Sequence, residues 1–301
     1  MIDESVVDES TGRKFYLVHP DSIRPDGQLT FILNIHGGGS FGAWQRLYFP
    51  AQDYVEKYRL VVATPTAATA EPMRRWIDEA DDDHLQNVVE IVFKRFGAQI
   101  SSFWLAGHSQ GGMTSRRLLS TDYYSRRVDG FLSLSGGRLG GRSDVVDSFG
   151  PPLQPGEQRR WPTRDGRRPQ FTAVPDPDTD LSFIFVTGEH EIKSLPETSS
   201  WAEKYAAGPR RRLDDVVDVE PGQTYDQRRE GRSSASWGFE PRPGKAEVFI
   251  YPDAKGGWVI ADVVRKDKGH TEGLEPRITE ELIKLIVGAP SGKARALLKT
   301  V

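Results

Sequence analysis

The chain has 301 residues, with 43 acidic side chains against 40 lysines and arginines, a net charge of -3 and no cysteine. The slightly acidic balance gives no indication of a nucleic-acid partner, and the lack of cysteine excludes disulfides and thiolate chemistry. No run approaches the roughly 18 apolar residues of a membrane helix, and the first residues lack the pattern of a signal peptide. We expect a cytoplasmic protein with no membrane partner, although a chain trimmed of a leader would look the same.

The first predicted elements are strands at residues 14–18 and 29–35. The second is a nearly continuous apolar run, which is typical of a strand covered on both faces. It ends in His36-Gly37-Gly38-Gly39, where the glycines would let the backbone pass close to a reacting carbonyl. In acyl-transfer enzymes such a loop supplies oxyanion-hole N–H groups, for which Gly38 and Gly39 are the candidates. Taken alone, the motif also fits a flexible glycine turn.

A third strand is predicted at residues 60–63, followed by a helix with one apolar face. The residues of that face are Leu85, Val88, Val89, Val92 and Phe96. The run Asp81-Asp82-Asp83 stands near the start of this helix, where carboxylates suit the helix dipole. Followed by His84, the run could also indicate a metal site. We favour capping and predict no metal, because no second cluster of ligands accompanies it.

The pentapeptide Gly107-His108-Ser109-Gln110-Gly111 follows an apolar run at residues 103–106 and precedes a helical pattern. This strand, turn and helix context is what a G-x-S-x-G nucleophile elbow requires. The flanking glycines would allow the strained turn that lifts the hydroxyl out of the sheet, so Ser109 is the candidate nucleophile. The N–H group of Gln110, at the start of the helix, is a further candidate oxyanion donor.

These motifs resemble those of the α/β-hydrolases. The HGGG loop is similar to that of lipases and esterases of this fold, and the GHSQGG stretch, with GHT at residues 269–271, is similar to polyhydroxyalkanoate depolymerases and feruloyl esterases. The resemblance spans roughly residues 12–288. It implies an α/β-hydrolase fold, with a mostly parallel central sheet flanked by helices, and a triad in the order serine, acid, histidine. It says little about substrate, since one fold hosts many chemistries.

The resemblance implies that the triad acid lies on the turn after a predicted strand at residues 181–187. That turn begins at Gly188 and contains two glutamates. Glu191 occupies the place where the family commonly has aspartate in a G-x-x-D pattern, and Glu189 is the rival.

The triad histidine should lie between the last strand and the final helix. A strand is predicted at residues 258–264 and a helix with apolar residues between 278 and 286. His270 lies on the polar turn between them, and none of the other histidines among the six of the chain fits that place.

Loops before helices rise toward the active-site edge in this fold, which makes Trp76 a candidate wall of the substrate pocket, with a packed surface tryptophan as an equal alternative. His108, inside the elbow, is a second candidate pocket residue.

Residues 1–301 are predicted to form one domain with insertions at about 138–180 and 207–245, both polar and without periodicity. Loops of this length are usually functional or disordered, and α/β-hydrolases often place a lid or a substrate-binding segment at the first position.

The sequence therefore predicts a serine hydrolase of carboxylic esters that forms an acyl-enzyme on Ser109 and acts on a small-molecule or polymer ester. An amidase or peptidase with the same triad is the alternative, and a catalytically silent binding protein is a further one. No cofactor is expected, because the glycine doublets at 136–137 and 140–141 lack the G-x-G-x-x-G spacing of a dinucleotide site. The sequence makes no prediction of oligomeric state.

Overall fold

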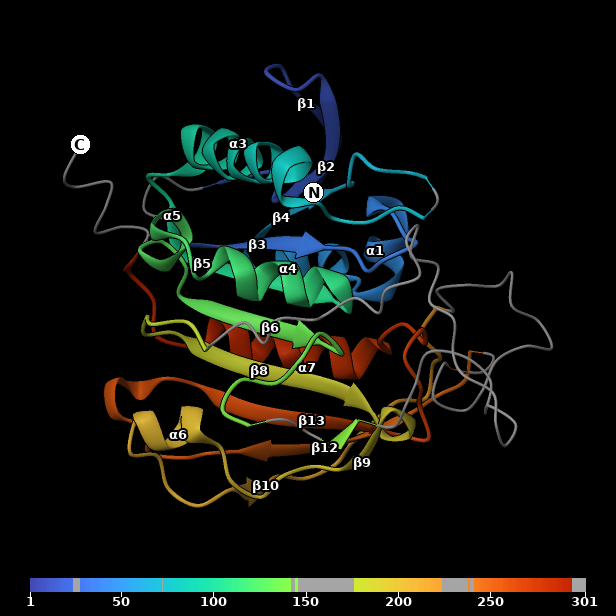
Figure 1. The fold of residues 1–301 in the computed structure, drawn as a ribbon, viewed down its shortest axis with the longest axis vertical. Helices are drawn as coiled ribbons and strands as arrows, with labels where there is room; N and C mark the ends of the chain where they lie inside the picture. Colours follow the sequence, from blue (N-terminus) through green and yellow to red (C-terminus); the bar gives the residue numbers. More distant parts are fainter. Residues whose placement is uncertain are drawn as a thin grey trace, which may run out of the picture.

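The computed structural model describes residues 1–23, 28–71, 73–141, 144–145, 176–223, 238 and 241–293. Within these residues, eleven strands form one sheet in the order β1-β2-β4-β3-β5-β6-β8-β13-β12-β10, with β11 also paired to β12 (Figure 1). These strands are β1 (Ile2–Asp8), β2 (Arg13–His19), β3 (Leu29–Ile35), β4 (Leu60–Pro65), β5 (Ile100–His108), β6 (Gly130–Leu134), β8 (Ser182–Gly188), β10 (Arg211–Arg212), β11 (Val216–Val217), β12 (Lys245–Ile250) and β13 (Ile260–Lys266). Strands β7 (Asp144–Val145) and β9 (Ile192–Ser194) pair separately.

The centre of the sheet is parallel. Strands β4, β3, β5, β6, β8 and β13 run in the same direction, each paired to the next. The strands at both edges, β1 and β2 on one side and β12, β10 and β11 on the other, are antiparallel to their neighbours. The predicted mostly parallel sheet is thus confirmed. Because the carboxyl ends of parallel strands meet at one edge, the loops after β3, β5, β8 and β13 come together there.

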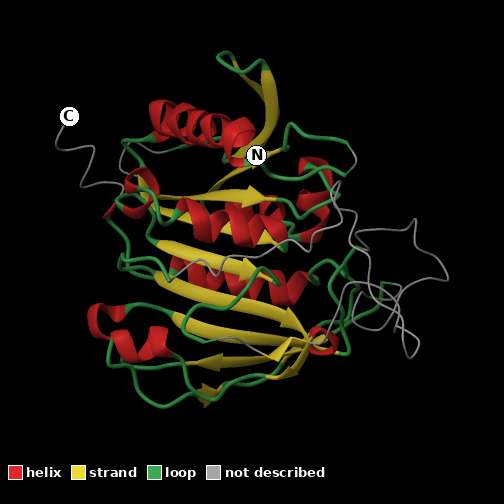
Figure 2. Ribbon diagram, in the orientation of Figure 1, coloured by secondary structure: helices red, strands yellow, loops and turns green. Residues whose placement is uncertain are grey.

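Helices cover both faces of the sheet (Figure 2). They are α1 (Gly42–Tyr48), α2 (Val55–Tyr58), α3 (Asp78–Phe96), α4 (Gln110–Leu118), α5 (Asp122–Ser125), α6 (Ser200–Lys204) and α7 (Pro276–Val287). Alternation along β3 explains the two layers: Phe31 packs in one apolar cluster with Val89 of α3, whereas Ile32 packs in the other with Leu282 of α7. Strands buried on both faces are apolar at nearly every position, and the run at 29–35 fits this pattern, with only Thr30 and Asn34 polar.

Most predicted elements are found with shifted ends. The strand predicted at 29–35 matches β3, whereas the one predicted at 258–264 begins only at Ile260, because Trp258 follows a turn of 3₁₀ helix at Lys255–Gly257. The second predicted insertion contributes β10 and β11 to the sheet edge. Residues 146–175, the larger part of the first predicted insertion, and residues 224–237 of the second lie outside the described residues.

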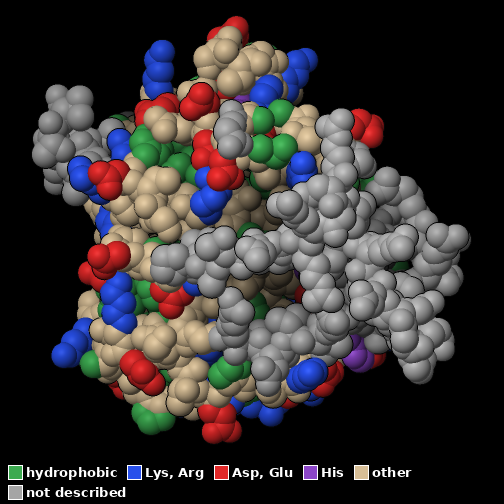
Figure 3. Space-filling view, in the orientation of Figure 1, with side chains coloured by type: hydrophobic (Ala, Val, Ile, Leu, Met, Phe, Trp, Pro, Cys, Tyr) green, Lys and Arg blue, Asp and Glu red, His purple; other side chains and the backbone are tan. Residues whose placement is uncertain are grey.

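No helix within the described ranges has the length and apolar character needed to cross a membrane. On the face shown in Figure 3, lysine and arginine side chains are interspersed with aspartate and glutamate. This mixture agrees with the nearly balanced charge of the chain.

Candidate active site

Ser109 lies at the turn between the carboxyl end of β5 and the first residue of α4. Its φ of 52° and ψ of -118° lie in a region that residues other than glycine rarely adopt. Holding a residue in such a conformation costs of order 1–3 kcal/mol. The Ser109 N–H group donates to the carbonyl oxygen of Leu134 in β6 at 2.8 Å, which ties the turn to the neighbouring strand. The predicted strained elbow is therefore present, and the serine itself carries the strain.

The glycines that flank Ser109 have a different role from the predicted one. Neither Gly107 nor Gly111 has a positive φ. A Cβ atom on Gly107 would lie 2.3 Å from the carbonyl carbon of Gly111, and one on Gly111 would lie 2.2 Å from the carbonyl oxygen of Ile35. The prediction that these glycines supply conformational freedom is wrong. They let α4 pack directly against β5 and the end of β3.

The three predicted triad residues lie in one chain of hydrogen bonds. The Ser109 hydroxyl is 2.8 Å from Nε2 of His270, and Nδ1 of His270 is 2.6 Å from Oε2 of Glu191. Ser109 is partly exposed, whereas His270 and Glu191 are each only 5% exposed. The Ser109 hydroxyl is therefore accessible to a substrate, whereas His270 and Glu191 are shielded from water.

The carboxylate of Glu191 is held on both oxygens. Oε1 accepts hydrogen bonds from the Gly188 N–H group and the Ser135 hydroxyl, each at 2.7 Å, while Oε2 faces His270. Burial raises the pKa of Glu191, but the charge of His270 and these hydrogen bonds outweigh it, so the pKa lies below its ordinary value. Ser135 was missed in the sequence. It follows β6 directly and has a φ of 54°, and no local motif marks it.

The rival acid, Glu189, faces away from the histidine. Its carboxylate forms an ion pair with Lys266 and accepts a hydrogen bond from the Asp267 N–H group at 2.8 Å. Its side chain is 39% exposed. Of the two glutamates weighed from the sequence, the structure brings only Glu191 to His270.

His108 lies behind the triad histidine. Its Nε2–H group donates to the carbonyl oxygen of His270 at 2.9 Å, and the two rings are 4.8 Å apart. The side chain is 1% exposed, and burial holds its pKa well below the ordinary value, so the ring is neutral. His108, predicted as a pocket residue, therefore supports the loop that carries His270.

A network of buried charges also fixes that loop. Arg265 donates to the carbonyl oxygen of Glu272 at 2.6 Å and pairs with Glu275 at 3.0 Å. Lys268 pairs with the same Glu275 at 2.9 Å. These four side chains are at most 2% exposed. Removing one partner of a buried pair costs about 3–5 kcal/mol because a charge is left unpaired, so the conformation of the loop that carries His270 depends on all the partners being present.

Of the candidate oxyanion donors, Gly38 lies against the side chain of Gln110. A Cβ atom on Gly38 would be 3.4 Å from Oε1 of Gln110. The N–H group of Gln110 is the first of α4 and has no acceptor within the helix. Gly39 is different, since its N–H group donates to the carbonyl oxygen of Arg74 at 2.7 Å. In this conformation the Gly39 N–H group is therefore not available as the predicted oxyanion donor. With its φ of 76°, Gly39 adopts the left-handed backbone conformation at the turn of the loop.

Trp76 lies beneath the HGGG loop. Its indole N–H group donates to the carbonyl oxygen of His36 at 2.8 Å, and the two rings are 4.6 Å apart. The side chain is 5% exposed and belongs to the apolar core. Trp76 is packed, as in the alternative weighed from the sequence, but it lies in the core and not at the surface. No group of three or more metal-ligating side chains occurs among the described residues.

Comparison with solved structures defines the class of fold. Acetyl xylan esterase from Aspergillus awamori matches with a TM-score of 0.51 and 13% sequence identity, covering 95% of this chain and 100% of that one. Thermogutta terrifontis esterase 2, phosphonylated by sarin, matches with a TM-score of 0.40 and 15% identity over 62% of this chain and 72% of that one. A poly(3-hydroxybutyrate) depolymerase from Bordetella parapertussis matches with a TM-score of 0.37 and 17% identity, covering 65% of this chain and 70% of that one.

The sequence matches no family model and no curated protein. The match to the acetyl xylan esterase extends over nearly the whole chain and, with the parallel sheet described above, it shows that this chain has the α/β-hydrolase fold. The predicted fold class is confirmed.

Proposed function

We propose that the chain is a serine hydrolase that cleaves carboxylic esters through an acyl-enzyme on Ser109. The observation that carries the proposal is the unbroken chain of hydrogen bonds from Ser109 through His270 to Glu191, with distances of 2.8 and 2.6 Å. A serine hydroxyl is a weak nucleophile and needs an adjacent base. His270 is that base, and Glu191 fixes its tautomer and stabilises its charged form.

In the first half of the reaction, Oγ of Ser109 attacks the ester carbonyl carbon while its proton passes to Nε2 of His270. The carbonyl oxygen becomes an oxyanion, which accepts hydrogen bonds from the backbone N–H groups of Gly38 and Gln110. The tetrahedral intermediate then collapses, and His270 returns the proton to the departing alkoxide. An alcohol leaves and the acyl group stays on Ser109.

Water completes the cycle. It attacks the acyl carbon and gives a proton to His270, which passes the proton back to Oγ of Ser109 as the carbon–oxygen bond to the serine breaks. A carboxylic acid is released and the hydroxyl is restored. These steps use only the side chains named here, the backbone donors and water.

An ester is the favoured substrate class over an amide. The acetyl xylan esterase is an ester hydrolase by name and shares the fold. An amide carries a poorer leaving group than an ester, because the departing amine must be protonated by His270 as the carbon–nitrogen bond breaks.

Parallel assays on p-nitrophenyl acetate and the matched p-nitroanilide test the proposal, with Ser109→Ala and the exposed Ser120→Ala as a matched pair of variants. We expect Ser109→Ala to lose about 10,000-fold or more in ester turnover at an unchanged melting temperature, and Ser120→Ala to match the wild type. A folded Ser109→Ala variant with a tenth of wild-type turnover would refute the role of Ser109. Faster cleavage of the anilide would move the assignment to an amidase.

A further inference from the structure

The described residues of the loop at 66–77, between β4 and α3, contact both segments that carry the candidate oxyanion donors. On the HGGG side, the carbonyl oxygen of Arg74 accepts the Gly39 N–H group at 2.7 Å. On the elbow side, the Trp76 N–H group donates to Oε1 of Gln110 at 3.2 Å. The loop is therefore hydrogen-bonded to Gly39, which follows Gly38, and to the side chain of Gln110.

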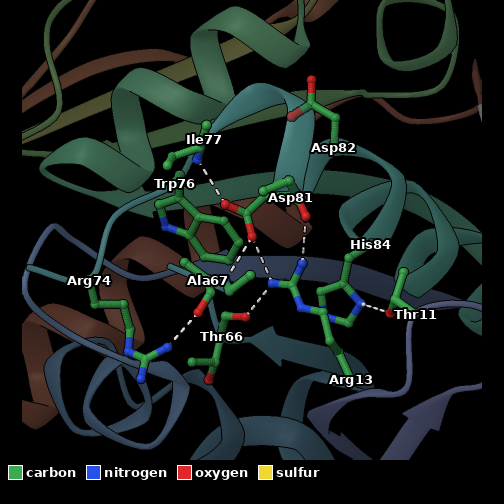
Figure 4. Close-up of polar contacts among 12 residues, drawn as sticks. Thr11, Arg13, Thr66, Ala67, Arg74, Trp76, Ile77, Asp81, Asp82 and His84 are labelled. Carbon is green, nitrogen blue, oxygen red and sulfur yellow. Dashed lines mark hydrogen bonds and ion pairs between the residues drawn. The ribbon is translucent and has the colours of Figure 1, made fainter. Parts of the chain in front are cut away.

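One buried carboxylate fastens this loop at both ends. Oδ1 of Asp81 accepts the N–H group of Ala68 at 2.9 Å, and Oδ2 accepts the N–H group of Ile77 at 2.8 Å. Asp81 is 0% exposed. Two backbone hydrogen bonds from residues nine positions apart thus meet on a single side chain, which closes the loop (Figure 4).

Arg13 of β2 supplies the charge that a buried carboxylate requires. Its guanidinium is 2.8 Å from Oδ1 of Asp81 and also donates to the carbonyl oxygens of Thr66 at 2.5 Å and Ala80 at 3.0 Å. The cation therefore ties together the first residue of the loop and the first turn of α3.

The three neighbouring aspartates differ in what they do. Only Asp81 bears out the capping interpretation, because its carboxylate accepts the N–H group of Ile77, the N-cap residue of α3. The helix α3 begins at Asp78, and its N-cap residue Ile77 makes no side-chain cap. Asp82 pairs with Arg117 of α4 at 2.6 Å. Asp83 is exposed to solvent. Only Asp81 points into the loop.

We infer that Asp81 is a positioning residue for the oxyanion hole and acts through the 66–77 loop. This inference rests on the proposed function. Asp81 makes no contact with the reacting atoms, but its two hydrogen bonds set the loop that holds Gly39 and Gln110. A displacement of 1 Å in a catalytic group can cost about 100-fold in rate, so loss of this fastening weakens transition-state stabilisation more than substrate binding.

Asp81→Asn tests the inference, with Asp83→Asn as the matched control. The asparagine keeps the size of the side chain, but its NH₂ group faces one of the two backbone N–H donors, and Arg13 loses its anion. We expect kcat for p-nitrophenyl acetate to fall about 10-fold to 100-fold per active site, with KM changed by less than about threefold. Active sites are counted by fluorophosphonate titration, so that a smaller folded fraction does not lower the result.

A second readout separates positioning from a merely structural role. A trifluoromethyl ketone forms a hemiketal oxyanion on the serine, so its inhibition constant should rise in proportion to the loss in kcat. A structural role alone would lower the melting temperature and the titrated fraction while leaving kcat per active site and the inhibition constant unchanged.

Arg13→Gln provides a further test should Asp81→Asn not fold, because the Arg13 side chain is 17% exposed and tolerates change better. We expect a loss of about 3-fold to 10-fold in kcat per active site, since the backbone hydrogen bonds to Asp81 remain. Wild-type kcat per active site in the folded variants would overturn the inference. If the wild-type chain cleaves no ester and binds no fluorophosphonate, the proposed function fails instead.

Discussion

Replacing Glu191 by glutamine should stop turnover without unfolding the chain. The glutamine carbonyl oxygen can keep the hydrogen bonds that Oε1 of Glu191 accepts from Gly188 and Ser135, each at 2.7 Å. Its NH₂ group then faces Nδ1 of His270, which lies 2.6 Å from the carboxylate in the native chain. An NH₂ donor at that distance forces Nδ1 to accept, so the ring proton moves to Nε2.

With the proton on Nε2, His270 cannot take the proton of Ser109. We expect kcat to fall on the order of 1,000-fold, which corresponds to about 4 kcal/mol of lost transition-state stabilisation. Glu189→Gln is the matched control. The Glu189 carboxylate forms a surface ion pair with Lys266, and such a pair contributes about 0–1 kcal/mol to stability. Replacing Glu189 by glutamine should therefore lower kcat by less than 10-fold.

The assay is steady-state hydrolysis of p-nitrophenyl acetate by both variants, with melting temperatures measured alongside. The larger loss should occur in Glu191→Gln at a melting temperature close to that of the wild type. A larger loss in Glu189→Gln would contradict the geometry and move the triad acid to Glu189.

Two further predictions concern stability. Gly111→Ala should lower the free energy of unfolding by about 3 kcal/mol in urea denaturation, because its Cβ atom would lie 2.2 Å from the carbonyl oxygen of Ile35; an unchanged denaturation midpoint would refute the close approach of α4 and β3. The second prediction concerns His36, whose pKa is lowered by burial to about 4. At a pH below 6.5, the ordinary pKa of histidine, this side chain therefore takes up a proton when the chain unfolds. Its contribution to stability is complete above pH 6.5 and is lost as the pH falls toward 4, in total about 3 kcal/mol, with the buried His108 acting in the same direction. His36→Gln should flatten this slope, and a free energy of unfolding that stays constant between pH 6.5 and 4 in the wild type would contradict the assignment.

The sequence predicts the parts of this molecule that follow from local patterns. The run at 29–35 is apolar at nearly every position because β3 is buried on both faces, and the elbow motif marks the turn after β5. The order of the motifs along the chain also led to Ser109, Glu191 and His270. These residues are far apart in sequence, but parallel strands bring the ends of β5, β8 and β13 to one edge of the sheet.

What the sequence could not give are contacts between side chains from distant segments. Ser135 meets Glu191 across 56 residues, and Arg13 meets Asp81 across 68. No local pattern marks either pair. The sequence indicated the capping role of Asp81, but not its ion pair with Arg13 or its hydrogen bond to the Ala68 N–H group. Gly39 was assigned an oxyanion role from its motif alone, whereas its N–H group is occupied by Arg74, which belongs to a loop without a recognisable pattern.

The outermost strands β1, β10 and β11 were missed for a related reason. Strand β1 (Ile2–Asp8) alternates between partly buried and exposed positions over most of its length, and is rich in charged residues. Short, polar edge strands carry little of the apolar signal that identifies central strands. Their pairing with β2 and β12 depends on the neighbouring strands already being in place.

The central claim is that Ser109 is an activated nucleophile, and intact-mass spectrometry after incubation with a fluorophosphonate tests it most directly. The activation by His270 predicts one phosphonyl group per chain, located by peptide mapping on Ser109, with esterase activity lost in proportion to labelling. Ser109→Ala should remain unlabelled. Absence of an adduct on the folded wild-type chain, or equal labelling of Ser109→Ala, would contradict the claim.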